Sequence, residues 1–121
     1  MIIPTMPRIS RVVAVGHPDH VTQRGNYRQT VFETGLDYLL YLDRLKTYCR
    51  KYSLKMWAYC LMGNHVHFIT VPMEEDSLAR VFNTLPMRYS QYINDRRNVR
   101  GRLWQGGQGR FFSCVLDERH L

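Results

Sequence analysis

The chain has 121 residues, 45% of them hydrophobic, and it carries a formal net charge of +7 with an isoelectric point near 9.7. This length and composition fit one folded domain with a modest core and exclude an intrinsically disordered chain. Because no apolar stretch is long enough to span a bilayer and no signal-peptide pattern opens the chain, we expect a cytoplasmic protein without a membrane partner.

The first part of the chain predicts a strand followed by a helix. The residues near His20–Arg24 favour a strand, and a Gly-Asn pair directly after them marks a turn. Thr34 and Asp37 have the spacing of a helix capping box, and apolar residues then recur with a helical period. We therefore expect a helix over Leu36–Tyr52.

Two runs rich in aromatic and β-branched residues predict a hairpin in the middle of the chain. Leu54–Leu61 and His65–Val71 are its strands, and a Met-Gly-Asn triplet is its turn. Pro72 ends the second strand.

A second helix begins at Asp76 or Ser77, and its apolar period continues to Ile93. Pro86 lies inside this pattern, so we expect a kink or a break there. Residues 103–116 predict a further strand or hairpin around a Gly-rich loop, and the last residues resemble the start of a helix. The order strand, helix, strand, strand, helix, strand predicts an α+β fold, in which helices pack on one face of an antiparallel β-sheet.

Arginine supplies most of the positive charge. Of the 17 basic residues 14 are arginines, and 8 of these lie between Arg80 and Leu121, against 3 acidic residues. The planar guanidinium binds phosphate or a guanine edge with two hydrogen bonds, which lysine cannot do. This bias favours a polyanion as partner, although an ordinary basic surface has the same composition.

The segment Asn64-His65-Val66-His67-Phe68 is the sharpest chemical pattern in the chain. Side chains two positions apart on a strand leave the same face, with Cα atoms ~7 Å apart, so both imidazoles can reach one metal ion. Two histidines are too few for a protein-only zinc site. They suit a divalent cation that completes its shell with water and phosphate oxygens, such as Mg²⁺ or Mn²⁺. Two ordinary histidines on a polar sheet face are the alternative.

Four segments, in chain order, resemble the REP-associated tyrosine transposases, which belong to the HUH-type single-tyrosine transposases. They are Val21–Asn26, Leu61–Ile69, Tyr89–Asn94, and Gly101–Gln105 together with Arg110–Ser113. The resemblance covers nearly the whole chain. It implies one ferredoxin-like HUH transposase domain over residues 1–121, in a bacterial, nucleoid-associated protein.

The activity that this resemblance implies is metal-assisted transesterification of single-stranded or hairpin DNA. His65 and His67 would hold the divalent cation, and a tyrosine hydroxyl would attack the scissile phosphate to give a 5′-phosphotyrosine and a free 3′-hydroxyl. Family members carry this tyrosine, and tend to carry the third metal ligand, on a helix that would begin here at about Asp117. We therefore expect both beyond Leu121, so that the chain binds DNA without cleaving it. A homodimer is compatible with the resemblance.

Tyr89 and Tyr92 are the alternative nucleophiles inside the chain. Both lie on the second predicted helix. Tyr89 continues the apolar face of that helix, which favours packing in the core. Tyr92 lies off that face and could meet DNA.

Two groups of residues are candidates for DNA binding. Arg24, Gly25 and Asn26 follow the first strand and could bring a guanidinium and a close backbone to a phosphate or base edge, with a plain turn as the alternative. The second group alternates arginine with aromatic surface, as proteins that bind single strands do. It comprises Arg96, Arg97, Arg100, Arg102, Trp104 and Arg110. Burial in the core is the alternative for Trp104, and the Gly-rich insertion before Arg110 departs from the spacing of the family.

Two other classes of function are alternatives to a transposase. A non-catalytic nucleic-acid-binding module of the same α+β shape would use the histidines structurally. A histidine phosphoesterase would need a third alternating histidine, where Ile69 stands, or a second strand with a His-x-Thr or His-x-Ser pattern. The sequence has neither.

Overall fold

The computed structural model describes residues 13–105 and 111–116. Their elements follow the order strand, helix, strand, strand, helix, strand, and the four strands form one antiparallel sheet in the order β2-β3-β1-β4. The strands are β1 (Asp19–Arg24), β2 (Leu54–Leu61), β3 (His65–Pro72) and β4 (Phe112–Val115); the helices are α1 (Gly35–Lys51) and α2 (Ser77–Arg97), with a short 3₁₀ turn, η1 (Asn26–Arg28). This order is that of the ferredoxin-like fold, so the predicted α+β class is confirmed.

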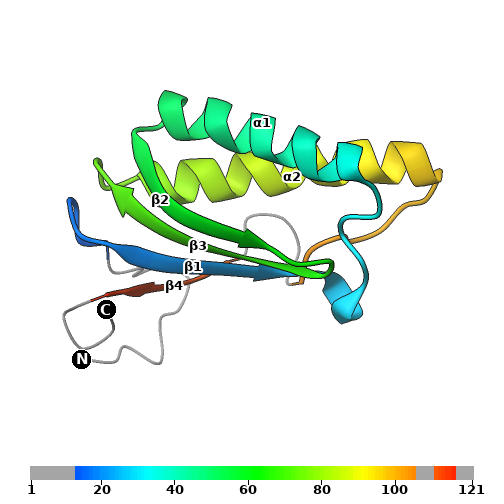
Figure 1. Ribbon diagram of the computed structural model, residues 1–121, viewed down its shortest axis with the longest axis horizontal. Coiled ribbons are helices and arrows are strands. Elements are labelled where there is room, and N and C mark those ends of the chain that lie inside the picture. The colour runs from blue at the N-terminus through cyan, green and yellow to red at the C-terminus, as the bar shows by residue number, and fades with distance from the viewer. Residues whose placement is uncertain (1–12, 106–110, 117–121) are drawn as a thin grey trace.

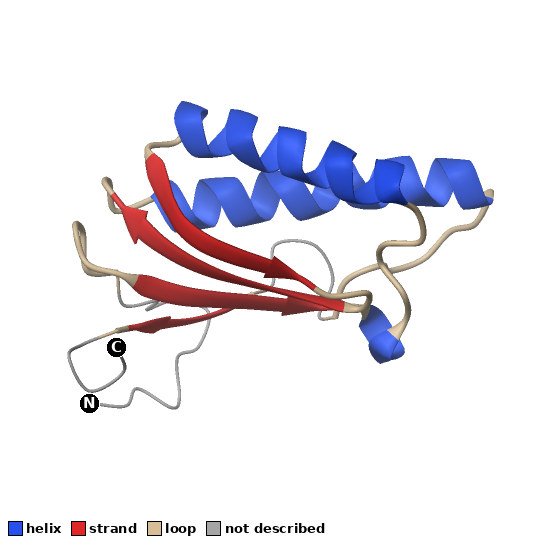
Figure 2. Cartoon of the chain, viewed as in Figure 1, coloured by secondary structure: helices blue, strands red, loops and turns tan. Residues whose placement is uncertain are grey.

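The two helices lie side by side on one face of the sheet, and the described part of the chain places no helix on the other face (Figures 1 and 2). We call this second surface the open face. None of the described helices is both long and apolar enough to cross a membrane.

Alternation along β3 divides its residues between the two faces. Val66 and Phe68 are buried under the helices, whereas His65 and His67 are half-buried on the open face. Val66 and Phe68 pack in a core of aliphatic and aromatic residues from both helices and from β1. Helix α2 contributes the largest number of these residues. The sheet therefore separates the core from the candidate site.

Helix α1 begins at the predicted capping box. The Thr34 hydroxyl accepts a hydrogen bond from the Asp37 backbone amide at 3.3 Å, and an Asp37 carboxylate oxygen accepts one from the Thr34 amide at 3.1 Å. These bonds satisfy two amides that a helix N-terminus otherwise leaves without partners.

Helix α2 runs without interruption through Pro86, so the predicted break is absent (Figure 1). Proline removes one backbone donor, but the residues before and after it, Phe82, Leu85 and Tyr89, are all buried in the core and hold the helix in place. The Pro86 carbonyl also accepts a hydrogen bond from the Trp104 indole at 3.2 Å.

Candidate active site

The two histidines of β3 lie together on the open face, as their spacing predicts. Their ring centroids are 4.8 Å apart and the ring planes are perpendicular. Both side chains are half-buried, so neither is enclosed in the apolar interior. This arrangement leaves the pair accessible to a ligand that approaches the open face.

A neighbouring amide orients His65. The Nδ1 atom of His65 lies 2.7 Å from the Asn64 side-chain oxygen, and the Asn64 amide nitrogen lies 3.5 Å from the Arg28 carbonyl. Because an amide oxygen only accepts, this contact places the ring hydrogen on Nδ1. The Nε2 lone pair of His65 is then available for a ligand.

Two residues of β1 orient His67. The Nδ1 atom of His67 lies 3.3 Å from the Thr22 hydroxyl and 3.3 Å from the Nε2 atom of His20. The His20 ring stacks on that of His67 at 5.4 Å. Burial, together with the positive charges of His65, His20 and Arg24, lowers the pKa of His67, which favours the neutral imidazole that binds metals.

Sequence reasoning did not identify His20 and Thr22. The signal that could have found them is their alternation on β1, which places both on the open face, in a register where Thr22 lies opposite His67. The antiparallel pairing of β1 with β3 is non-local, and so the contact emerges only with the fold.

The histidine pair fits a divalent cation that takes its remaining ligands from elsewhere. Both Nδ1 atoms have polar neighbours, and the two Nε2 atoms are the ring nitrogens left for a ligand. Metal-bound histidines characteristically use one ring nitrogen for the metal and the other for such an orienting contact. Within residues 13–105 and 111–116, no group of three or more His, Cys, Asp or Glu side chains could hold a metal ion.

Arg24 brings positive charge next to the histidines. It is exposed at the end of β1 and lies opposite His65 in the sheet register. Together with Arg28 and Asn64, these two residues line a hollow at this end of the sheet. Arg24 also lines a second hollow, together with Thr22, Gln105 and Phe112. A guanidinium in this position can bind a phosphate next to the histidines.

The sequence profile of the family described as "Transposase IS200 like" matches residues 16–119. The chain belongs to this family. The transposase family predicted from the four sequence segments is thereby confirmed. No curated protein sequence matches the chain.

Two solved structures resemble this member of the family. One is a REP-associated tyrosine transposase bound to a REP hairpin, with a TM-score of 0.63, 17% identity, and coverage of 93% of this chain and 64% of that one. The other is described as a candidate transposase from Deinococcus radiodurans R1, with a TM-score of 0.65, 16% identity, and coverage of 93% and 88%. The chain thus spans less than two thirds of the first of these proteins. At these identities the comparison shows a shared fold.

The two tyrosines of α2 lie on the side of the sheet opposite to the histidines. Tyr89 is 1% exposed, and its hydroxyl donates to the Val31 carbonyl at 2.6 Å. Tyr92 is half-buried, and its hydroxyl donates to Asp37 at 3.4 Å. Burial raises the pKa of Tyr89 far above its ordinary value, which opposes formation of a phenolate there. Tyr89 therefore packs in the core, as its place on the apolar face of the helix predicted. Tyr92 instead belongs to a polar cluster around Asp37.

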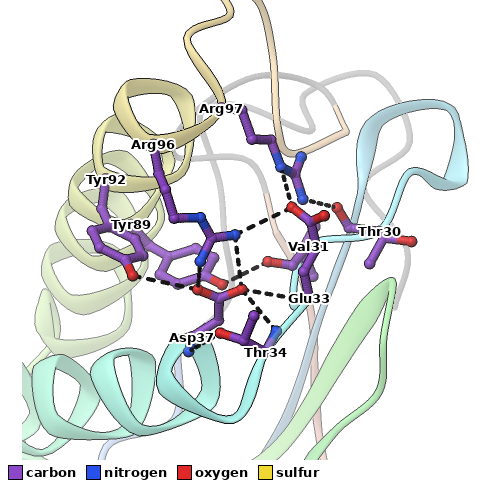
Figure 3. Close-up of polar contacts among 9 residues, drawn as sticks. All are labelled: Thr30, Val31, Glu33, Thr34, Asp37, Tyr89, Tyr92, Arg96 and Arg97. Carbon is purple, nitrogen blue, oxygen red and sulfur yellow. Dashed lines mark hydrogen bonds and ion pairs between the residues drawn. The ribbon is translucent and has the colours of Figure 1, made fainter.

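That polar cluster holds two of the arginines that the sequence suggested for DNA (Figure 3). Arg96 forms ion pairs with Asp37 and Glu33, and Arg97 donates to Glu33 at 2.5 Å and to the Thr30 carbonyl at 2.9 Å. These contacts join the end of α2 to the segment that enters α1. Arg96 and Arg97 therefore join α2 to this segment, and their contact with DNA stays a prediction.

Of the other DNA-binding candidates after α2, one is buried and two are exposed. Trp104 is 1% exposed and packs in the core, so its ring has no face for a base. Arg100 and Arg102 are exposed, and no carboxylate in the described part of the chain pairs with either. Arg110, the Gly-rich loop and the segment from Asp117 lie outside the described residues.

Gly25 and Asn26 have structural roles. The Gly25 amide donates to the Asn64 carbonyl at 2.8 Å, and the Asn26 amide donates to the Leu103 carbonyl at 2.7 Å. A Cβ atom on Gly25 would lie 2.3 Å from the Gln29 carbonyl oxygen. This glycine therefore permits a close approach of its own chain, and the expected approach to a phosphate stays a prediction.

Replacing Gly25 with alanine should destabilise the protein by about 1–3 kcal/mol, the usual cost of forcing extra volume into a packed site. The Gln29 carbonyl is backbone and cannot move alone. Chemical denaturation measures the loss, and Gly35→Ala is the matched control because a Cβ atom at Gly35 meets nothing within 4 Å. If the two variants unfold at the same denaturant concentration, the turn accommodates the added Cβ atom without loss of stability.

Proposed function

We propose that this chain is an HUH-type DNA transposase domain, extending over residues 1–121, that binds single-stranded or hairpin DNA and supports metal-assisted transesterification. The observation that carries the proposal is the pair of half-buried imidazoles on the open face, oriented through Nδ1 and placed beside Arg24. A solved relative with the same fold is described as bound to a REP hairpin, which supports hairpin DNA as the substrate class.

The residues of the site have distinct roles in this proposal. His65 and His67 would hold Mg²⁺ or Mn²⁺ through Nε2, and the bound cation would polarise the scissile phosphate as a Lewis acid. Arg24 and Arg28 would bind the adjoining phosphates and so position the strand across the open face. His20 and Thr22 would hold the His67 ring in its ligating orientation.

The nucleophile in this proposal is a tyrosine hydroxyl that attacks phosphorus, joins the 5′-phosphate to the protein and releases a 3′-hydroxyl. Tyr89 and Tyr92 are poor candidates for this step because both hydroxyls donate to groups on the helical side of the sheet. We therefore place the nucleophile on a segment that reaches the open face.

A non-catalytic nucleic-acid-binding module is the second candidate, because the arginines on the open face would bind a strand without any metal. The two candidates differ in one property. Only the transposase requires a cation at His65 and His67, so the response to Mn²⁺ separates them.

DNA binding should depend strongly on salt and on Arg24. We expect the affinity for a hairpin with a single-stranded flank to fall as salt rises, with a log–log slope of about −0.7 for each phosphate contact. The Arg24→Gln variant should bind more weakly, with a slope smaller by about 0.7. Fluorescence anisotropy of a labelled oligonucleotide over a KCl series measures both quantities.

The control for this experiment is Arg44→Gln, since Arg44 is half-exposed on α1, away from the open face. Its affinity and slope should equal those of the wild-type protein. A wild-type affinity that does not change with salt would refute the proposed DNA contact.

A further inference from the structure

Tyr27 projects into solvent from an unusual backbone turn. Its side chain is 94% exposed, the highest value among the large hydrophobic residues that the structure describes. The φ angles of Tyr27 and Arg28 are 53° and 58°, so two consecutive residues other than glycine adopt the left-handed conformation. Side chains with a Cβ atom rarely adopt it, and such strain concentrates at functional positions.

Backbone hydrogen bonds at both ends hold the η1 turn in this conformation. The Arg28 amide donates to the Gly25 carbonyl at 3.0 Å, and the Gln29 amide donates to the Asn26 carbonyl at 3.1 Å. The bonds from Gly25 to Asn64 and from Asn26 to Leu103 fix the start of the turn to the β2–β3 turn and to the segment after α2. The backbone that carries Tyr27 is thus held in place, and its ring projects into solvent.

The turn lies next to the candidate active site. Figure 1 shows η1 beyond the end of β1, beside the turn between β2 and β3. Arg28 lines the same hollow as Arg24, Asn64 and His65. The Gln29 side chain also donates to the Arg102 carbonyl at 2.6 Å, which brings the exposed basic segment close to the turn. The turn that carries Tyr27 therefore adjoins exposed basic residues, among them Arg24, Arg28 and Arg102.

We propose that Tyr27 is a stacking platform for an unpaired nucleobase that adjoins the phosphate bound by Arg24 and Arg28. An exposed aromatic ring on a fixed backbone next to arginines is the combination with which proteins bind single-stranded nucleic acid. The base must be unpaired because bases inside a duplex already stack on both faces. The adjoining basic residues favour a nucleic acid over an apolar protein surface as the partner. This inference rests on the proposed function and adds the residue that receives the base.

The test compares Tyr27→Phe with Tyr27→Asn on a hairpin that carries a single-stranded flank. Phenylalanine keeps the stacking ring, so its affinity should stay within about twofold of the wild-type value. Asparagine removes the ring, and the affinity should fall by about 5- to 150-fold, the range measured for loss of one base–aromatic stack. Because asparagine adopts the left-handed conformation more readily than tyrosine, the Tyr27→Asn variant should melt no lower than the wild-type protein.

Modified oligonucleotides locate the stacked base. An abasic site at the stacked position should abolish the difference between the wild-type protein and Tyr27→Asn, whereas abasic sites elsewhere in the flank should not. The fluorescence of 2-aminopurine at that position should be quenched by the wild-type protein and by Tyr27→Phe only. The matched control is Trp57→Asn, since Trp57 is 61% exposed on the edge strand β2.

Three outcomes overturn the inference. Wild-type affinity in Tyr27→Asn would do so, as would a loss in Tyr27→Phe as large as that in Tyr27→Asn. In both cases salt-dependent binding by the wild-type protein would leave the proposed DNA contact standing. If the wild-type protein binds no flanked hairpin, the proposed function and this inference fail together.

Discussion

Replacing His65 with alanine is expected to abolish the rise in melting temperature that Mn²⁺ produces in the wild-type protein. A ligand present at tenfold its dissociation constant stabilises a protein by about 1.4 kcal/mol, which corresponds to several degrees in a domain of this size. With one imidazole removed, a single nitrogen ligand remains, and the cation should bind too weakly to change the melting temperature. His67→Ala should behave in the same way.

Two comparison variants make the Mn²⁺ result specific. His17 is exposed outside the sheet, so His17→Ala should keep the full effect of Mn²⁺. His20→Ala should keep part of it, since loss of a residue that orients a metal ligand typically costs 10–100-fold in metal affinity. Differential scanning fluorimetry with Mn²⁺ or EDTA measures the melting temperatures of the wild-type protein and the four variants. An unchanged Mn²⁺ effect in His65→Ala would exclude the metal site, and DNA binding without any Mn²⁺ effect would favour the non-catalytic module.

Neutralising Asp37 should destabilise the protein at neutral pH. The Asp37 side chain is fully buried, whereas that of Arg96 remains 33% exposed. Breaking a buried ion pair costs about 3–5 kcal/mol, and the exposure of Arg96 reduces our expectation for Asp37→Asn to about 2 kcal/mol. Urea denaturation at pH 7 measures this difference.

The effect of Asp37 should also depend on pH. Burial alone would raise the pKa of Asp37, but hydrogen bonds from Arg96 and from the Glu33 and Thr34 amides hold the pKa below its ordinary value of 3.8. A carboxylate whose pKa is lower in the folded state stabilises the protein above its unfolded pKa, and this contribution disappears as the pH falls through the folded value. The difference between wild type and Asp37→Asn should therefore be constant from pH 7 to about pH 5 and shrink below pH 4.

Asp43→Asn is the control for both measurements. Asp43 lies on the same helix, but its side chain is 69% exposed and its nearest cation, on Arg44, is 3.9 Å away. Exposed pairs of this kind contribute about 0–1 kcal/mol. If Asp43→Asn and Asp37→Asn lower the stability equally, the buried ion pair has no special role.

Local patterns predicted the hairpin and the capping box correctly, because the residues that determine them are neighbours in the sequence. The range predicted for β2 is the one observed, and the alternation of Val66 and Phe68 with the two histidines assigned the faces of β3. The absence of a break at Pro86 has the opposite origin. Propensity argues for a break there, but the packing of α2 against the core outweighs one missing hydrogen bond.

The contacts of individual arginines could not be predicted from the sequence. Arg96 and Arg97 meet Glu33 and Asp37 across about sixty positions of the chain, and only the packing of α2 against α1 brings them together. The left-handed conformation of Tyr27 could not be predicted from the sequence either, because tyrosine does not favour that region of backbone angles.

The two faces of β3 have a consequence for how the protein tolerates mutation. Substitutions at the histidine positions leave Val66 and Phe68 packed, so the proposed metal binding can be lost without loss of folding. Deletion of one residue within β3 would exchange the two sets, turning imidazoles toward the core and apolar rings toward water. Inactive but folded descendants of this chain should therefore carry point substitutions in β3 and keep its length.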